Sequence, residues 1–218
     1  MRNVAPIAAL ASFALLGAQR PIDSQVVLER YAVALADAPV PRAEIFVYNV
    51  SQAGPTNIEQ RHQIYRSGIE VRDEILAENG VSLKRKIVRI ARRADVYSIG
   101  ALAPRLYDYE LLFVRARSDG KHLDYVYRAV PLRPAVGGFA IDRVAIDGLT
   151  YLPRTIDFHS YSDTGVSGTG TIEFGPAGGY WMPMLATVNA VVGAGVARER
   201  IVFSNYRFPL SLPRSTFL

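Results

Sequence analysis

Alternation of apolar and polar residues with a period of two runs through most of this chain and constrains its fold more than any other feature. From residue 43 onward, short alternating segments are separated by turn residues such as Gly54-Pro55, Asn79-Gly80 and Asp147-Gly148. Successive side chains of a β-strand point to opposite faces, so this period is typical of strands. Asn-Gly and Asp-Gly are preferred in two-residue hairpin turns. The sequence therefore predicts a mainly β protein with about eleven strands joined by tight turns.

The number of strands predicts the shape of the sheet. Short connections between sequential strands indicate an antiparallel meander. About eleven strands in one layer curl, and the natural result is an unclosed antiparallel β-barrel, a curled half-barrel. A length of 218 residues suits a single β domain, which we expect to span residues 21–218.

Two segments lack the strand pattern and are candidates to cover the sheet. Residues 22–37 are expected to form an N-terminal helix, capped by Asp23 or Ser24 and ended by Pro39 and Pro41. Its apolar residues recur at helical spacing, at Val27, Leu28, Tyr31 and Leu35. Residues 92–106 fit a loop or a short helix better than a strand, and we expect them to form a short lid segment.

The first twenty residues have the pattern of a signal peptide. Arg2 precedes an uncharged stretch from Val4 to Ala18, which is about the length of a signal-peptide apolar region. An uncleaved anchor or a buried helix is the alternative. We expect residues 1–20 to be a signal peptide cleaved near Ala18, and the mature protein to be periplasmic. The chain has no Cys, so neither a disulfide nor a lipidated Cys is expected.

Basic residues are concentrated between positions 84 and 93 in a chain whose net charge is +5. This patch lacks the interleaved aromatic residues of a nucleic-acid-binding module, and nucleic acid is not an expected partner. A solvated strand face or loop is the simpler interpretation. The alternative is a weak contact with an anionic membrane surface or an acidic partner through Lys84, Arg85 and Arg89.

No set of residues predicts catalysis. The three His residues lie on separate predicted strands, without Cys and without metal-ligand spacing, and are expected to be exposed. The Gly-rich stretch 165–170 lacks the Lys and the strand-turn-helix context of a phosphate loop, and Ser167 is not in a nucleophile elbow. The carboxylates are scattered. We expect no enzymatic activity, no cofactor and no metal site.

Aromatic residues are the main candidates for a binding function. Tyr and Trp on alternating strands pack across strands, and they also line amphipathic ligand cavities. The interior of such a barrel is either a filled core or a cavity, and both interpretations remain open here. The candidate ligand-binding residues are Tyr109, Leu111, Phe113, Tyr125, Tyr127 and Trp181.

The last third of the chain resembles a known superfamily. Tyr180-Trp-Met-Pro183 followed by Arg200-Ile-Val-Phe-Ser-Asn-Tyr-Arg-Phe208 is similar to the closing strands of outer-membrane lipoprotein-sorting-like proteins. Asp147-Gly148-Leu-Thr-Tyr-Leu-Pro153 resembles the hairpin before them. The chain thus resembles the LolA/LolB-like superfamily, which implies an unclosed barrel with helices as a lid.

Two functions follow from this resemblance. The first is an exported protein that binds a lipid or the acyl chains of a lipoprotein on the concave face of the sheet. The alternative is a non-catalytic envelope protein with a filled core, which acts by interaction with other envelope proteins or as a sensor.

Overall fold

The computed structural model describes residues 23–92, 98–118, 120–133, 138–162, 165–192 and 195–218. The predicted signal peptide, residues 1–20, lies outside these ranges, as do residues 93–97 of the expected lid segment. No described helix has both the length and the apolar character needed to cross a membrane.

The described residues form one antiparallel sheet of eleven strands, with helical elements at both ends of the chain and between β4 and β5. The helical elements are α1 (Ser24–Asp37), α2 (Ile99–Leu102) and the 3-10 helix η2 (Arg214–Phe217). The strands are β1 (Ala43–Ala53), β2 (Ile58–Ser67), β3 (Glu70–Glu78), β4 (Val81–Arg92), β5 (Tyr109–Ser118), β6 (Leu123–Pro131), β7 (Phe139–Asp147), β8 (Pro153–Ser162), β9 (Gly165–Ala177), β10 (Tyr180–Val192) and β11 (Gly195–Arg207). The predicted fold class, a curled and unclosed antiparallel sheet with an N-terminal helix, is confirmed.

The strands are not arranged in simple chain order. The order across the sheet is β4-β3-β2-β1-β11-β10-β9-β8-β7-β6-β5. Two meanders, β1–β4 and β5–β11, therefore join where β1 pairs with β11, for example Tyr48 opposite Phe203. The interpretation of the sequence as a meander is correct within each run but did not include this pairing. Its consequence is that β4 and β5 form the two edges of the sheet.

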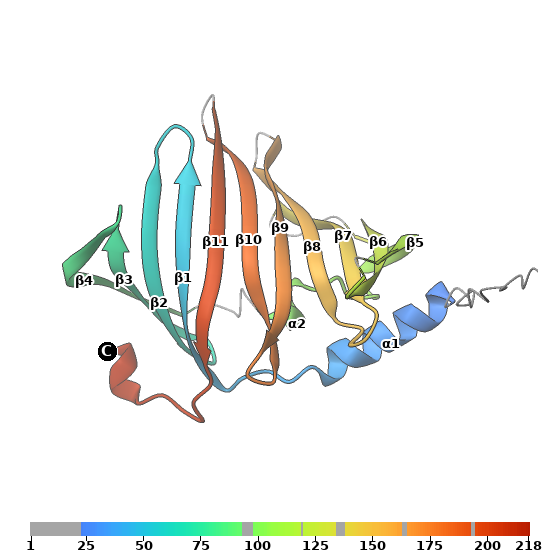
Figure 1. Cartoon of the computed structure of the whole chain (residues 1–218), viewed down its shortest axis with the longest axis horizontal. Helices are drawn as coiled ribbons and strands as arrows, with labels where there is room; N and C mark the ends of the chain where they lie inside the picture. Colours follow the sequence, from blue (N-terminus) through green and yellow to red (C-terminus); the bar gives the residue numbers. More distant parts are fainter. Residues whose placement is uncertain (1–22, 93–97, 119, 134–137, 163–164, 193–194) are drawn as a thin grey trace, which may run out of the picture.

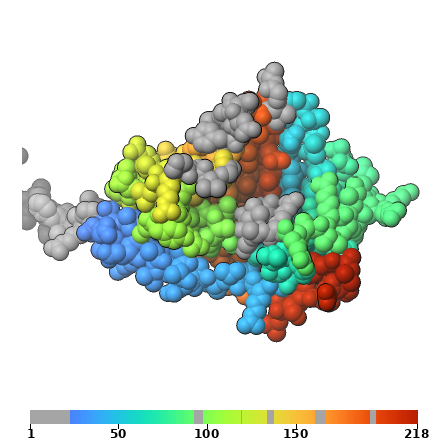
Figure 2. All heavy atoms as spheres, turned by 180° about the vertical axis from the view of Figure 1, so that it is seen from behind, coloured from blue at the N-terminus to red at the C-terminus, as the bar shows by residue number. Residues whose placement is uncertain are grey.

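The sheet curls so that β5 and β6 turn around one end of the molecule, while α1 runs across the lower ends of β7 and β8 (Figure 1). Seen from the other side, the molecule is hollowed, with the orange-to-red strands β10 and β11 at the floor of the hollow (Figure 2). We call this side the concave face.

Local sequence explains the position and the buried face of α1. The Asp23 side chain caps the helix by accepting a hydrogen bond from the Gln25 backbone N–H at 2.9 Å, as one of the two predicted caps. Val27 and Tyr31, one turn apart, are fully buried, and Leu28 and Leu35 pack beside them. The predicted apolar stripe is thus the face with which α1 lies on the sheet.

Candidate functional site

Strand register places one set of side chains of every strand on the concave face. Tyr127 lies opposite Val144, which lies opposite Ile156, and Ile156 lies opposite Ile172. The same row continues through Ala186 and Ile201 on the next two strands. An apolar row therefore crosses the sheet from β6 to β11, because every strand contributes an apolar residue at the same level.

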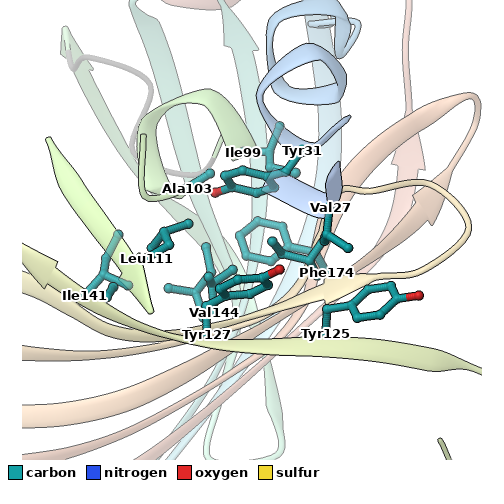
Figure 3. Close-up of a cluster of buried hydrophobic side chains, with 13 residues drawn as sticks. Val27, Tyr31, Ile99, Ala103, Leu111, Tyr125, Tyr127, Ile141, Val144 and Phe174 are labelled. Carbon is teal, nitrogen blue, oxygen red and sulfur yellow. The ribbon is translucent and has the colours of Figure 1, made fainter. Parts of the chain in front are cut away.

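The helices fill one half of the concave face with a cluster that we call the helix-side cluster. Val27 and Tyr31 of α1 and Ile99 of α2 pack onto residues of β5–β9 such as Tyr127 and Phe174 (Figure 3). Its buried residues are Val27, Tyr31, Ile99, Ala103, Leu111, Tyr125, Tyr127, Ala129, Ile141, Val144, Ile146, Ile156 and Phe174. This half of the concave face is a packed core in the described structure.

Tyrosine hydroxyls in this cluster bond to backbone carbonyls of the covering segments. The Tyr31 hydroxyl donates to Pro104 O at 2.7 Å, and the Tyr127 hydroxyl donates to Ser24 O at 3.0 Å. Burial raises the pKa of Tyr127 to about 12 and raises that of Tyr31 further, because a low-dielectric site disfavours the phenolate. Both hydroxyls therefore stay protonated donors, which hold α1 and the segment after α2 against the sheet and each other.

The structure brings most of the predicted ligand-binding residues together, in this cluster. Leu111, Tyr125 and Tyr127 are buried in it, and Tyr109 and Trp181 pack against it while partly exposed. Phe113 is 48% exposed, with its ring 5.5 Å from that of Tyr127. Because α1 and α2 cover these side chains, a ligand could reach most of them only if the helices moved.

A second set of apolar side chains on the concave face is only half-buried, and we call it the open lining. These side chains belong to β1, β8, β9, β10 and β11, and they lie outside the area that α1 and α2 cover. Its members are Tyr48, Phe158, Ile172, Val188 and Ile201. Ile172 joins the two halves, since it packs against the helix-side cluster and also against the buried group formed by Phe46, Ile64, Ala186 and Phe203.

Sequence reasoning did not select the open lining as a site. Ile172 and Phe158 lie on or beside the Gly/Thr-rich strand β9, whose weak alternation hid them. The role of Gly170 explains that composition, because a Cβ there would lie 2.6 Å from the Phe158 ring. The missing side chain therefore leaves room for Phe158 on the concave face. The usable signal was the alternation in β10 and β11, which places Val188 and Ile201 on one face.

Polar groups occupy the concave face on the β1–β3 side. Glu44 is buried and accepts a hydrogen bond from Arg66 Nε at 2.7 Å. His62 is also buried, which contradicts the expectation of exposed His residues, because it lies opposite Tyr48 and stacks on its ring at 4.4 Å. His62 Nδ1 lies 2.8 Å from Asp73 Oδ1. The concave face can thus hold an apolar chain beside a polar group.

An open groove of about 730 Å³ lies near the ends of β6–β10, and Trp181 lines it. Its inner wall contains a network of salt bridges, in which Arg154 pairs with Asp124 at 3.1 Å and with Asp147 at 2.5 Å. Arg117 also pairs with Asp124, at 3.0 Å. The two guanidinium groups face two carboxylates, so the charges of the network balance internally, although Arg154 Nε and Asp124 Oδ1 form no hydrogen bond. The network is therefore a structural element of the turn region.

The described residues contain no group of three or more His, Asp or Glu side chains arranged to hold a metal ion. His62 pairs with Asp73, and His159 pairs with Asp142. These pairs tie neighbouring strands together.

Comparison with known proteins relates the chain to solved structures only. No protein-family model matches the chain, and no curated protein matches it. A LolA superfamily protein from Nitrosomonas europaea is 15% identical over 90% of this chain and 98% of its own, with a TM-score of 0.51. A DUF1329 family protein from Desulfovibrio piger is 11% identical over 89% and 96%, with a TM-score of 0.56.

A third structure, a domain from Vibrio parahaemolyticus provisionally named an outer membrane lipoprotein-sorting protein, is 13% identical over 89% of this chain and 97% of its own, with a TM-score of 0.52. The three superpose over nearly the whole of their own lengths, although few residues are identical. The superposition shows that the chain shares the fold of these solved structures, one of which is a LolA superfamily protein.

Proposed function

We propose that this protein, as a single domain of residues 21–218 in the periplasm, binds the acyl chains of a lipid or lipoprotein on its concave face and catalyses no reaction. The observation that carries the proposal is the open lining, five apolar side chains that the strand register places on the concave face and that are only half-buried. The fold is also that of a domain named for lipoprotein sorting, which supports this class of ligand.

The energetics of the open lining suit an acyl chain. Each CH₂ group moved from water to an apolar surface contributes ~0.8 kcal/mol, so one chain contributes several kcal/mol even when partly covered. Ile172 connects the open lining to the helix-side cluster. A chain that enters at the open lining would therefore extend towards the six residues predicted from the sequence when α1 moves outward.

The polar groups of β1–β3 would face the other end of such a ligand. Tyr48 belongs to the open lining and also stacks on His62, so the apolar and the polar parts of the concave face are contiguous. An amphipathic ligand fits this arrangement better than a pure hydrocarbon, because its head group would lie beside the polar side chains of Glu44, Arg66 and His62.

The test compares two neighbouring positions of β10. Val188 faces the hollow, whereas Thr187 is exposed on the opposite face of the same strand. We expect native mass spectrometry of protein purified after export to show a lipid adduct, and a fluorescent palmitate analogue to bind in solution. Val188→Glu should abolish the adduct and weaken binding of the analogue by at least about ten-fold, because it places a charge against the acyl chain.

Thr187→Glu is the control, and it should keep both signals at the level of the unchanged protein. Circular dichroism and thermal unfolding establish that both variants fold. The alternative function, an envelope interaction or sensor protein with a filled core, is favoured by the packing beneath α1 and α2. It predicts no adduct and no binding of the analogue to any of the three proteins, and that result would contradict the carrier proposal.

A further inference from the structure

The edge strand β4 has an unpaired side in the described structure. Among the described residues it pairs with β3 alone, so backbone N–H and C=O groups along its outer side have no strand partner. Such an edge is a ready template for another extended chain.

The strand is strongly basic, and three of its cations form no ion pair among the described residues, although Arg89 lies opposite Asp73 in the strand register. Its sequence contains five Lys or Arg residues and no Asp or Glu. Lys86 binds Glu74 at 2.8 Å, and Arg92 lies 3.7 Å from Glu70. The remaining cations form no ion pair within the described part of the chain; they are Lys84, Arg85 and Arg89.

The geometry of β4 separates a basic bulge from a straight segment. Pairing with β3 passes from Ile75 opposite Ile87 to Ala77 opposite Ser82, so residues 83–86 bulge out of the ladder. Beyond the bulge, residues 87–92 pair without interruption. Ile87, Val88 and Ile90 of this straight segment are 47%, 41% and 47% exposed. The edge thus offers a regular ladder, apolar side chains on both faces and an excess of positive charge.

We propose that β4 binds an extended acidic segment of a partner protein, which adds to the sheet as a further strand along residues 87–92. Carboxylates of this segment pair with Arg89 and with Lys84 and Arg85 on the bulge, and its apolar residues cover Ile87, Val88 and Ile90. A second copy of β4 is a poor occupant, because like charges directly across two strands repel.

Basic residues and bulges also protect sheet edges from unwanted pairing. Basic residues repel other basic strands, but they do not repel an acidic strand, which can therefore still pair with this edge. The proposal concerns the outer edge of the sheet and does not depend on the ligand of the concave face.

Three peptides of about ten residues test the proposal by fluorescence anisotropy. In the first, Glu alternates with Val; in the second, Lys replaces Glu; the third keeps every Glu but has Pro in place of the central Val residues. We expect the first to bind, with an affinity that falls as salt rises. The second should not bind. The third should bind at least about ten-fold more weakly, because Pro cannot donate to a ladder.

Variants assign the binding to β4. Arg89→Glu, and separately Lys84→Glu combined with Arg85→Glu, should each weaken binding of the first peptide by about ten-fold or more. The matched control is Arg115→Glu, an equal charge change at an exposed position of the opposite edge strand β5, and it should leave the affinity unchanged. Circular dichroism checks the fold of each variant.

Three results would each overturn the proposal. The first is equal binding of the Glu and Pro peptides, which would indicate charge attraction without strand pairing. The second is an equal loss of affinity with Arg115→Glu. The third is no binding of the first peptide. Binding to vesicles that contain phosphatidylglycerol would in that case make β4 a membrane-surface contact.

Discussion

Asp147 and Gly148 show, at the scale of single residues, why the turn between β7 and β8 requires these two residue types. Asp147 Oδ1 accepts hydrogen bonds from the backbone N–H groups of Leu149 at 3.1 Å and Thr150 at 2.8 Å. A Cβ at Gly148 would lie 2.9 Å from the Leu123 carbonyl oxygen. The sequence predicted a turn from Asp-Gly, but the long-range contact with Leu123 depends on how β6 packs beside it.

The first prediction concerns the pH dependence that Asp147 contributes. Burial alone would raise the pKa of its carboxyl, but hydrogen bonds from Thr150, Arg154 and Leu149 lower the pKa below its usual value of 3.8. A lowered folded-state pKa gives stability that is complete above the unfolded pKa and is lost as pH falls towards the folded pKa. Asp147→Asn should therefore reduce the free energy of unfolding at pH 7 by about 1–3 kcal/mol and flatten its decline below about pH 4.

Urea unfolding between pH 7 and pH 3 measures this effect. Glu173→Gln, at an exposed position that lines the same groove, is the control and should follow the unchanged protein at every pH. An Asp147→Asn protein with the original acid sensitivity would show that other carboxylates dominate the acid response.

The candidate site was predictable only in part at the residue scale. Alternation on β5 and β6 correctly grouped Leu111, Tyr125 and Tyr127 on one face. It did not reveal that Val27 and Tyr31 of α1 occupy the space above them, because sequence periodicity reports which face a residue is on and not what lies opposite that face.

At the scale of elements, the two helices are held by the sheet more than by their own sequence. α2 has only four residues and its Ser98 cap, and a helix this short is not stable alone. It is ordered because Ile99 and Ala103 are buried in the helix-side cluster. The sequence could therefore indicate the region as a loop or short helix but could not place it.

The second prediction tests the link between α1 and the segment that follows α2. Tyr31→Phe removes the hydroxyl that donates to Pro104 O and leaves a buried carbonyl without its partner. We expect the free energy of unfolding to fall by about 1–2 kcal/mol and amide exchange to accelerate at residues 99–103. Tyr107→Phe, at a residue 65% exposed, should change neither. Unchanged exchange in Tyr31→Phe would mean that apolar packing alone holds α2.

At the scale of the whole molecule, the joint between β1 and β11 unites the two meanders. Phe203 lies opposite Tyr48 and within 6.1 Å of the rings of both Phe46 and Tyr48. The end of the chain adds a smaller contact, in which Arg72 of β3 donates to Thr216 O at 3.0 Å. The packed rings of Phe46, Tyr48 and Phe203 therefore hold together two meanders whose contacting residues are far apart in the chain.

The third prediction is a large loss of stability when this joint is weakened. Phe203→Ala should reduce the free energy of unfolding by about 3–5 kcal/mol, because it leaves a cavity between the two meanders. The midpoint of thermal unfolding should fall by roughly 6–20 °C. Leu149→Ala, at a residue 88% exposed, is the control and should have little effect. A loss below about 1 kcal/mol would contradict a central role for Phe203.

Local physical chemistry in the sequence was enough to predict the strands and the first helix of this protein, though not α2 or η2. A period of two, Asn-Gly and Asp-Gly turns and one capped amphipathic helix predicted about eleven strands, their hairpins and α1, because each of these signals lies within a few neighbouring residues. The eleven-stranded sheet and the Asp23 cap confirm this.

Only the tertiary structure decided the position of the first strand, β1, in the order of the sheet. Pairing of β1 with β11 joins residues about 150 positions apart, and no local pattern encodes such a partner, because any strand of suitable alternation satisfies the same hydrogen bonds. That pairing makes β4 and β5 the edges of the sheet. The packing of α1 and α2 fills one part of the concave face and leaves the open lining beside it.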